Sequence, residues 1–464
     1  MNLLNKTLSQ ISHHKYLRCD YKYWQTHKLY AFTDFSYLKD MFEIISGSVQ
    51  TKSYSTQKTS ISYIRIGDIS YKFGIKDEDL LFLCDDAEIA EKRLLKKDDL
   101  VLATIGTVGK IGLANEFIGG THSNNTVILR KKTTKLNVAF YEKLFQSDLY
   151  IKYIFGLVSQ KAQPNLQQYD LEHIKIPNIG DDTIKSSMIA IKPLGEKIKP
   201  LQSALVSTQR IIDAVLKREF HFNYENFEEL KKNAQFGSSL GAFANNPDLR
   251  FSAKFHRPAG EYVQQELNRI TTKKIKHYLA EPIILGASIS PSDYNENGDY
   301  QYLSMATIKN WKFEGETAQY VSTSYSNSKA EKTIKRGDLI LARSGEGTIG
   351  KVALIEQEDV KAVFADFTMR IRLKNYNLKF AYYFMRSTYF QYLIEIYKKG
   401  LGNNTNIFPI VIREFPLPDI SLEEQERIVD EIQEEINKQN DIKNQIARLR
   451  ERIDEIIEDT IKSV

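Results

Sequence analysis

An internal repeat constrains this chain more than any other feature. The run at 99–114, DLVLATIGTVGKIGLA, aligns with the run at 338–355, DLILARSGEGTIGKVALI, whose turn is longer. The offset of about 240 residues is far too long for a solenoid. Further pairs keep nearly the same offset: Thr126 with Thr368, Ser147 with Ser387, and Asn165 with Asn406. The repeat therefore predicts two similar folded domains.

A helical segment follows each copy, and 212–216 aligns with 453–457. The predicted order along the chain is a domain at 1–178, a helix at 179–222, a flexible linker at 223–247, a second domain at 248–419 and a C-terminal helix at 420–464. The linker is placed by its Gly, Ser and Asn residues.

Each copy is predicted to be mixed α and β, so the fold class is α+β. The apolar, β-rich runs at 101–104 and 339–343 each precede a glycine turn and a second apolar run, which indicates strand, turn, strand. The segments 138–158 and 378–397 carry aromatic and aliphatic residues at helical spacing, as amphipathic helices on a sheet do.

Ser421 is a plausible N-cap for a helix without Pro or Gly through Val464, about 60 Å long. The inner segment contains Pro193 and Pro200, so its uninterrupted helix is expected to begin near Leu201. Both segments have apolar seams that suit a coiled coil. The residues expected to pack between the helices are Ile212, Val215, Leu216, Ile446, Leu449, Ile453 and Ile456.

Composition narrows the class of protein. The 464 residues are 42% hydrophobic and 27% charged, as in ordinary globular proteins. The net charge is +5, and because 421–464 is acidic, the remainder is more basic, which suits a polyanionic partner. Cys19 and Cys84 make no disulfide framework or metal spacing. With no signal peptide or membrane span, a cytoplasmic location is expected.

The turn Gly345-Glu-Gly-Thr-Ile-Gly-Lys351 matches nucleotide-binding patterns in part. A phosphate-binding loop needs a helix directly after it and a Ser or Thr after the Lys, whereas Val352 follows here and begins a predicted strand. The turn is therefore interpreted as a glycine turn that faces DNA. The residues expected to contact DNA there are Arg343, Ser344 and Lys351, matched in the first copy by Thr104 and Lys110.

A basic, amide-rich loop follows the helical segment of each copy. Asn, Gln and Lys are side chains that read base edges and bind phosphates, although solvated loops share this composition. The residues expected to contact DNA there are Lys161, Gln163, Asn165 and Gln167 in the first copy, and Lys398, Lys399, Asn403 and Asn404 in the second.

Motifs of catalysis were not found in the sequence. The chain lacks the Asn/Asp-Pro-Pro-Tyr/Phe motif of amino-methyltransferases and a Cys/His cluster for a metal. No catalytic residue and no metal site are therefore predicted.

Three motifs carry a resemblance to a known family. They are the run GDLILARSG ending at Gly345 with IGKV after it, the Asn-rich loop before Phe415-Pro-Leu-Pro418, and SLEEQERI from Ser421. Together with the order of elements, they resemble the specificity subunits of type I restriction-modification enzymes. The first copy departs from this pattern, with Thr104-Ile in place of Arg-Ser.

The resemblance implies that each domain is a target-recognition domain for half of a split double-stranded DNA site, and that the two helices pack antiparallel as a spacer. It implies that the chain itself is not an enzyme and holds no cofactor. Adenine-N6 methyltransferase subunits would use S-adenosylmethionine, and a restriction and translocase subunit would use ATP and magnesium.

Three alternatives remain at the level of sequence. The chain could serve a type IIB-like enzyme, which the co-purifying partner would reveal. It could bind nucleotide through Gly345–Lys351, in which case Lys351→Ala would abolish ATP binding. It could be a scaffold that recruits proteins only, in which case salt-dependent binding to duplex DNA would be absent.

Overall fold

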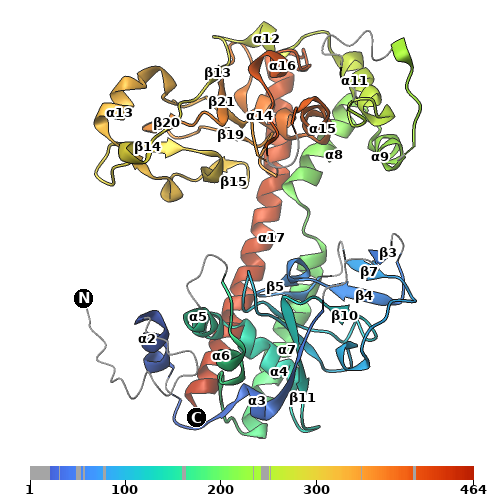
Figure 1. Ribbon diagram of the computed structural model, residues 1–464, viewed down its shortest axis with the longest axis vertical. Helices are drawn as coiled ribbons and strands as arrows, with labels where there is room; N and C mark the ends of the chain where they lie inside the picture. Colours follow the sequence, from blue (N-terminus) through green and yellow to red (C-terminus); the bar gives the residue numbers. More distant parts are fainter. Residues whose placement is uncertain are drawn as a thin grey trace. The chain divides into compact units, whose positions relative to one another are not determined.

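The computed structural model describes residues 21–30, 32–48, 54–55, 58–76, 80–158, 164–233, 235–241, 250, 252–345, 347–400 and 404–463. The chain divides into two compact units. Unit 1 comprises 1–204 and 442–464, and unit 2 comprises 205–441 (Figure 1).

Unit 1 mixes helices and strands. Its helices are α2 (Tyr21–Leu29), α3 (Leu38–Met41), α4 (Val138–Gln146), α5 (Asp148–Leu157), α6 (Gln168–Glu172) and α7 (Asp181–Ser203). Its strands are β1 (Phe35–Tyr37), β2 (Phe42–Ser46), β3 (Tyr54–Ser55), β4 (Ile61–Ile64), β5 (Ile69–Ser70), β6 (Gly74–Ile75), β7 (Leu81–Leu83), β8 (Leu100–Ala103), β9 (Ile111–Leu113), β10 (Thr121–His122), β11 (Thr126–Lys131) and β12 (Lys175–Pro177).

Unit 2 has a corresponding set. Its helices are α8 (Thr208–Phe220), α9 (Tyr224–Lys232), α11 (Pro258–Ile270), α12 (Ile275–Tyr278), α13 (Thr323–Ser328), α14 (Leu378–Arg386), α15 (Thr388–Tyr397) and α16 (Pro409–Ile412). Its strands are β13 (Ile284–Leu285), β14 (Tyr300–Leu303), β15 (Ile308–Lys309), β16 (Lys312–Phe313), β17 (Tyr320–Val321), β18 (Leu339–Ala342), β19 (Val352–Leu354), β20 (Ala362–Phe364) and β21 (Thr368–Ile371). Helix α17 (Leu422–Lys462) contributes to both units.

The strand order repeats between the units. Unit 1 contains an antiparallel sheet in the order β2-β11-β8-β9, and unit 2 contains its counterpart, β13-β21-β18-β19. A second sheet pairs β4 with β10 in parallel in unit 1 and β14 with β20 in parallel in unit 2. The predicted duplication and the α+β class are confirmed, and the strand, turn, strand predictions correspond to β8–β9 and β18–β19.

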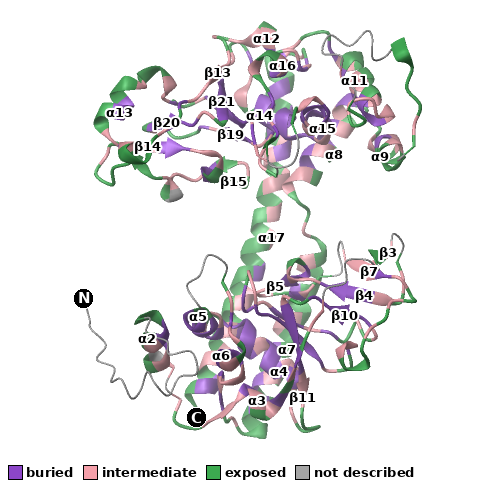
Figure 2. Ribbon diagram, viewed as in Figure 1, coloured by how far each residue is buried: buried purple, intermediate pink, exposed green. Residues whose placement is uncertain are grey.

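The central strand of each large sheet is buried on both faces. In unit 2, Leu339 and Leu341 lie in the cluster formed with helices α14 and α15, while Ile340 and Ala342 lie in the cluster with the smaller sheet. This alternation follows from the two-residue period of a strand. Figure 2 shows the buried residues concentrated on such strands and the helices beside them. The sheet is therefore a fixed base for the loops at its ends.

The predicted amphipathic segments are each two helices, α4 and α5 in unit 1 and α14 and α15 in unit 2. The break falls at the aligned serines. The Ser147 hydroxyl accepts a hydrogen bond from the Tyr150 amide at 3.3 Å, and the Ser387 hydroxyl accepts one from the Phe390 amide at 3.3 Å. A serine that caps the next helix satisfies one of its free amides.

The start of helix α17 agrees with the prediction. The Ser421 hydroxyl accepts a hydrogen bond from the Glu424 amide at 3.1 Å, and the Glu424 carboxylate accepts one from the Ser421 amide at 3.0 Å. This reciprocal arrangement is a capping box.

The prediction that an uninterrupted inner helix begins near Leu201 is wrong. Helix α7 continues through both prolines, and the interruption lies at 204–207, where Ser207 caps α8. The buried residues Ile184, Ile191 and Ile198 recur every seven residues across the prolines. Burial of that seam outweighs the loss of the proline amide donors.

The segment predicted as a flexible linker is partly helical. Helix α9 occupies its first part, and Phe227 on that helix is 1% exposed in the unit 2 core, against Tyr389 and Tyr392. The polar composition of the segment did not reveal that Phe227 and Tyr224 pack against the core. The remaining boundaries of the predicted domains stay a prediction.

The two helical segments pair antiparallel within unit 2. The Val206 amide donates to the Gln439 side chain at 2.7 Å, and further along α8, Glu219 forms an ion pair with Arg427 of α17. The residue numbers rise along one helix and fall along the other, so the helices are antiparallel. Ile212, Val215 and Leu216 lie in one buried cluster with residues of α17, namely Ile428, Val429 and Ile432.

In unit 1, α7 lies against the C-terminal part of α17. The Ser187 and Thr460 hydroxyls are 2.6 Å apart and buried. Of the predicted packing residues there, Ile446 and Ile453 are each 3% exposed, whereas Leu449 and Ile456 are half-buried. Ile457 and Ile461 are buried instead, so the buried seam of this part of α17 is shifted from the predicted stripe.

Candidate nucleic-acid interface

The two loops that the sequence singled out in unit 2 lie together. Strand β18 ends at Ala342, and the backbone then pairs Ser344 with Asn406 as an isolated bridge. The Ile407 amide donates to the Arg343 carbonyl at 2.9 Å, and the Gly345 amide donates to the Thr405 carbonyl at 3.3 Å. The fold therefore joins segments about 60 residues apart into one surface element.

The same junction forms in unit 1. Ile105 pairs with Asn165 as an isolated bridge. The Leu166 amide donates to the Thr104 carbonyl at 2.9 Å, and the Gly106 amide donates to the Pro164 carbonyl at 2.8 Å. Because the pairing recurs at aligned positions, it is a property of the repeated fold. We call each of these assemblies a loop junction.

A third segment completes each loop junction, and sequence reasoning missed it. The Arg343 amide donates to the Phe367 carbonyl at 2.9 Å in unit 2, and the Thr104 amide donates to the Asn125 carbonyl at 3.0 Å in unit 1. Each segment directly precedes the aligned threonine that opens β21 or β11. The two asparagines at 124–125 were the available signal, because Asn is common where backbones turn.

Arg343 connects all three segments of the unit 2 junction. Its guanidinium donates to the Asp366 carbonyl at 3.1 Å and to the Asn406 side-chain oxygen at 3.2 Å, and it lies 5.3 Å from the centre of the Phe408 ring. A planar group with several donors suits such a position. Arg343 therefore holds the junction together, besides offering charge to a ligand.

Thr104 and Ser344 lie at the junctions with their hydroxyls engaged inside the protein. Each residue is 6% exposed. The Thr104 hydroxyl donates to the Asn125 carbonyl at 3.4 Å, and the Ser344 hydroxyl donates to the Thr405 carbonyl at 3.1 Å. Both were predicted to face DNA, and their burial favours a positioning role.

The lysines of the unit 2 junction differ in the partners that their side chains and backbones have. Lys351 is half-buried, and none of the described residues forms an ion pair with it. The Lys398 ammonium lies 2.6 Å from the Glu395 carboxylate. Lys399 exchanges two backbone hydrogen bonds of 2.8 Å with Asn406, which fixes the course of the second loop.

Lys110 follows the glycine turn of unit 1 and contacts residues outside the junction. Its ammonium is 3.4 Å from the Ile66 carbonyl and 5.8 Å from the Tyr71 ring centre. Burial, followed by the positive charge of Lys76, lowers the pKa of Lys110 from its ordinary value. A phosphate placed beside this ammonium would offset both effects.

The remaining predicted DNA contacts divide into two groups. Gln167 is half-buried directly before α6, and Asn404 is exposed in the second loop of unit 2. The others lie outside the described residues, namely Lys161, Gln163 and Asn403.

The Gly345–Lys351 turn leads into strand β19, which begins at Val352 and pairs antiparallel with β18. A nucleotide loop would instead open a helix whose amide groups point at the phosphates. Among the described residues, no group of three or more His, Cys, Asp or Glu side chains is placed to hold a metal ion. No described helix is both long and apolar enough to cross a membrane.

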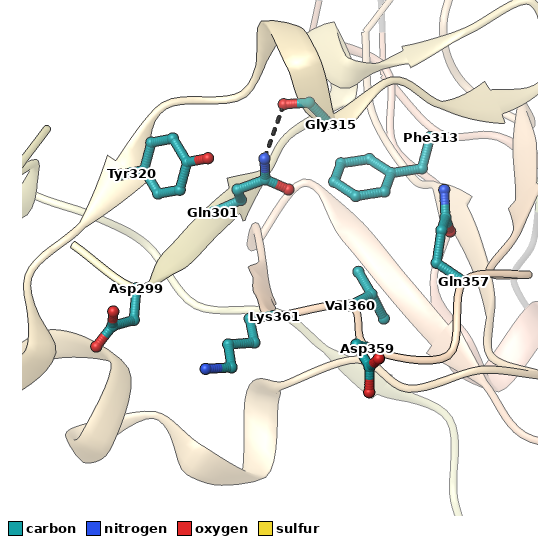
Figure 3. A pocket seen from close by; sticks show the side chains of 9 residues that line it. All are labelled: Asp299, Gln301, Phe313, Gly315, Tyr320, Gln357, Asp359, Val360 and Lys361. Atoms are coloured by element: carbon teal, nitrogen blue, oxygen red, sulfur yellow. Dashed lines mark hydrogen bonds between the residues drawn. The ribbon is translucent and has the colours of Figure 1, made fainter. Parts of the chain in front are cut away.

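An open cavity of about 410 Å³ lies elsewhere in unit 2 (Figure 3). Asp299, Gln301 and Lys361 line it near the starts of β14 and β20. The loop junction lies after the end of β20 instead, where the chain continues to Phe367. Because β14 and β20 are parallel, the cavity and the junction are at opposite ends of the same sheet.

The chain matches the family described as the type I restriction modification DNA specificity domain twice, over residues 33–178 and 279–449. No curated protein sequence matches it. The solved structures that it resembles include the S subunit of a type I restriction-modification system from M. genitalium, with 11% identity, a TM-score of 0.39, and coverage of 91% of this chain and 95% of that one.

Two further structures are similar at 14% identity. One describes complex assembly and conformational transition of the type I R-M system, with a TM-score of 0.39 and coverage of 92% of this chain and 97% of that one. The other is the HsdS subunit from Thermoanaerobacter tengcongensis, with a TM-score of 0.30 and coverage of 92% and 96%.

Proposed function

The chain belongs to the type I restriction-modification DNA specificity family, and from that premise we propose that it reads a bipartite double-stranded DNA site and directs adenine-N6 methylation and restriction to it. The family supports a role in DNA sequence recognition. The division of the site into two parts and the reactions directed to it are the proposal.

The observation that carries this proposal is the repeated loop junction. Each unit builds the junction at the same end of its central strand, and each includes a glycine turn beside a lysine, Gly109-Lys110 in unit 1 and Gly350-Lys351 in unit 2. Two similar readers on one chain convert two short contacts into one selective site.

The side chains at the junctions suit the surface of duplex DNA. Lys110 and Lys351 would contact phosphates, which gives affinity without sequence preference. Asn404, Gln167 and the guanidinium of Arg343 have the donors and acceptors that distinguish base edges.

Catalysis is proposed to lie in other subunits. Methyltransferase subunits would bind S-adenosylmethionine, and a restriction and translocase subunit would use ATP and magnesium. Residues 433–445 of α17 include no buried residue, so this part of the helix offers a surface to such a partner. The paired helices are proposed to set the spacing between the two half-sites.

The test is methylation of cognate and scrambled duplexes by the full complex. Arg343→Ala is expected to lower methylation of the cognate site about 10-fold to 100-fold, because it removes a junction-holding group worth about 1–3 kcal/mol of recognition. Arg336→Ala is the matched control, since Arg336 is exposed in the same unit and pairs only with the exposed Glu358 among the described residues. Unchanged methylation by Arg343→Ala would overturn the assignment.

A further inference from the structure

Two exposed aromatic side chains flank Arg343 in unit 2. Phe367 is 49% exposed and Phe408 is 39% exposed, although most phenylalanines of this unit are buried. The Phe367 carbonyl accepts the Arg343 amide at 2.9 Å, and the Phe408 ring lies 5.3 Å from the Arg343 guanidinium. An exposed apolar patch beside polar groups marks an interaction site.

The corresponding positions of unit 1 are polar. Because Thr126 aligns with Thr368, the position of Phe367 is held by Asn125. Because Asn165 aligns with Asn406, the position of Phe408 is held by Gln167. Their surroundings are the same repeated backbone pairing, so the fold does not require aromatic residues there. The aromatic pair is a property of unit 2 alone.

The ligand of this patch must combine negative charge with small apolar groups. Lys351 and Lys399 lie on the loops that carry Arg343 and Phe408, so these loops bring positive charge together with exposed apolar side chains. In the major groove of DNA, phosphates border base edges, and the C5-methyl of thymine is the largest apolar group displayed there. Duplex DNA with thymine at the contacted step meets both requirements.

We propose that Phe367 and Phe408 recognise thymine C5-methyl groups in the half-site that unit 2 reads, whereas unit 1 has no such preference at the equivalent positions. The proposal rests on the proposed function. It assigns to unit 2 a chemical preference that the polar pair of unit 1, Asn125 and Gln167, does not share.

The experiment replaces thymine by uracil, one position at a time, in both half-sites of the cognate duplex, and measures Kd by fluorescence anisotropy with the chain in complex with its methyltransferase subunits. Loss of one buried methyl is expected to weaken binding about fourfold at one or more positions of the unit 2 half-site. Uracil in the unit 1 half-site, where Asn125 and Gln167 stand in place of the two phenylalanines, is expected to leave Kd unchanged.

Variants connect the effect to the two residues. Phe367→Asn combined with Phe408→Gln, which introduces both residues of unit 1, is expected to bind thymine and uracil duplexes equally. Phe408→Leu keeps an apolar contact and should keep most of the preference. Tyr320→Ala is the matched control, because Tyr320 is 40% exposed at the cavity end of the same sheet, and it should keep the full preference.

The uracil series on the unaltered protein needs no variant to fold, so it decides the proposal by itself. Equal affinity for thymine and uracil throughout the unit 2 half-site would overturn it, as would a half-site without thymine. A preference that survives in Phe367→Asn combined with Phe408→Gln would also overturn it. Failure of the proposed function has another signature, which is equal affinity for the cognate and a scrambled duplex.

Discussion

In each unit, a buried ion pair holds the start of an inner strand, β8 in unit 1 and β18 in unit 2. Removing its carboxylate should destabilise that unit. In unit 1, Arg130 donates to Asp99 at 3.0 and 2.7 Å, and Asp99 is 1% exposed. In unit 2, Arg372 donates to Asp338 at 2.6 and 2.9 Å, and Asp338 is also 1% exposed. We expect Asp99→Ala and Asp338→Ala to lower the free energy of unfolding.

The magnitudes should differ between the units. Breaking a buried pair costs about 3–5 kcal/mol when the remaining charge has no compensation. Arg372 keeps a second carboxylate, Glu281, at 3.2 Å, so about 3 kcal/mol is expected for Asp338→Ala. Among the described residues, Arg130 keeps two carbonyl partners, at 3.3 and 2.8 Å, and the charge of Glu43 without a hydrogen bond to it, so about 4–5 kcal/mol is expected for Asp99→Ala.

The two tryptophans allow each unit to be followed separately. Trp24 lies in unit 1 and Trp311 in unit 2. In a Trp24→Phe background, the fluorescence of Trp311 during urea unfolding reports the stability of unit 2, and Trp311→Phe gives the converse. Glu358→Ala is the control in unit 2, since Glu358 belongs to an exposed ion pair and should change stability by less than about 1 kcal/mol.

Two results would refute this reasoning. A loss below about 1 kcal/mol in both variants would show that the buried pairs do not fasten the strands. A loss for Asp338→Ala that equals or exceeds the loss for Asp99→Ala would show that Glu281 does not compensate Arg372.

Burial, followed by the charge of Arg93, lowers the pKa of His122 to about 4. The stabilisation from keeping His122 neutral is therefore complete above its ordinary pKa and is lost as pH falls toward 4. In urea unfolding, unit 1 should lose about 3 kcal/mol of stability between pH 7 and pH 4 beyond the loss in a His122→Gln variant. Lys351→Ala should reduce the slope of log Kobs against log salt for duplex DNA by about 0.9, and Lys398→Ala should change it less, because Lys398 already has a carboxylate partner; equal slopes would contradict this. Thr460→Val should destabilise unit 1 by about 1 kcal/mol because it removes the hydrogen bond with Ser187, whose hydroxyl keeps the Thr183 carbonyl as a partner. In thermal melts, the double variant with Ser187→Ala should lose less than the sum of the two single variants.

Local patterns in the sequence were sufficient for the repeated elements. The apolar, β-rich run at 339–343 predicted a strand, and Ser421 predicted the start of α17, because strand propensity and a helix cap are each set by neighbouring residues. The same reasoning failed at Pro193 and Pro200, where a seam of buried isoleucines against another helix outweighs local propensity.

The sequence predicted the separate loops of the candidate site but not the way in which they come together. The sequence identified the loops of Arg343 and Asn406 separately, because glycine turns and amide-rich loops are visible locally. It did not reveal that the loops pair with each other, that 365–367 joins them, or that Ser344 is buried. Backbone pairing between distant segments depends on where the strands place their ends, which no local pattern contains.

The sequence by itself determined that this protein is a duplicated α+β chain with two helical segments, because duplication and periodicity are written in residue order. Only the tertiary structure decided which loops form one surface, which polar side chains are turned inward, and where Phe367 and Phe408 remain exposed. Exposure and long-range pairing result from the packing of the whole unit, since each depends on residues far away in the chain.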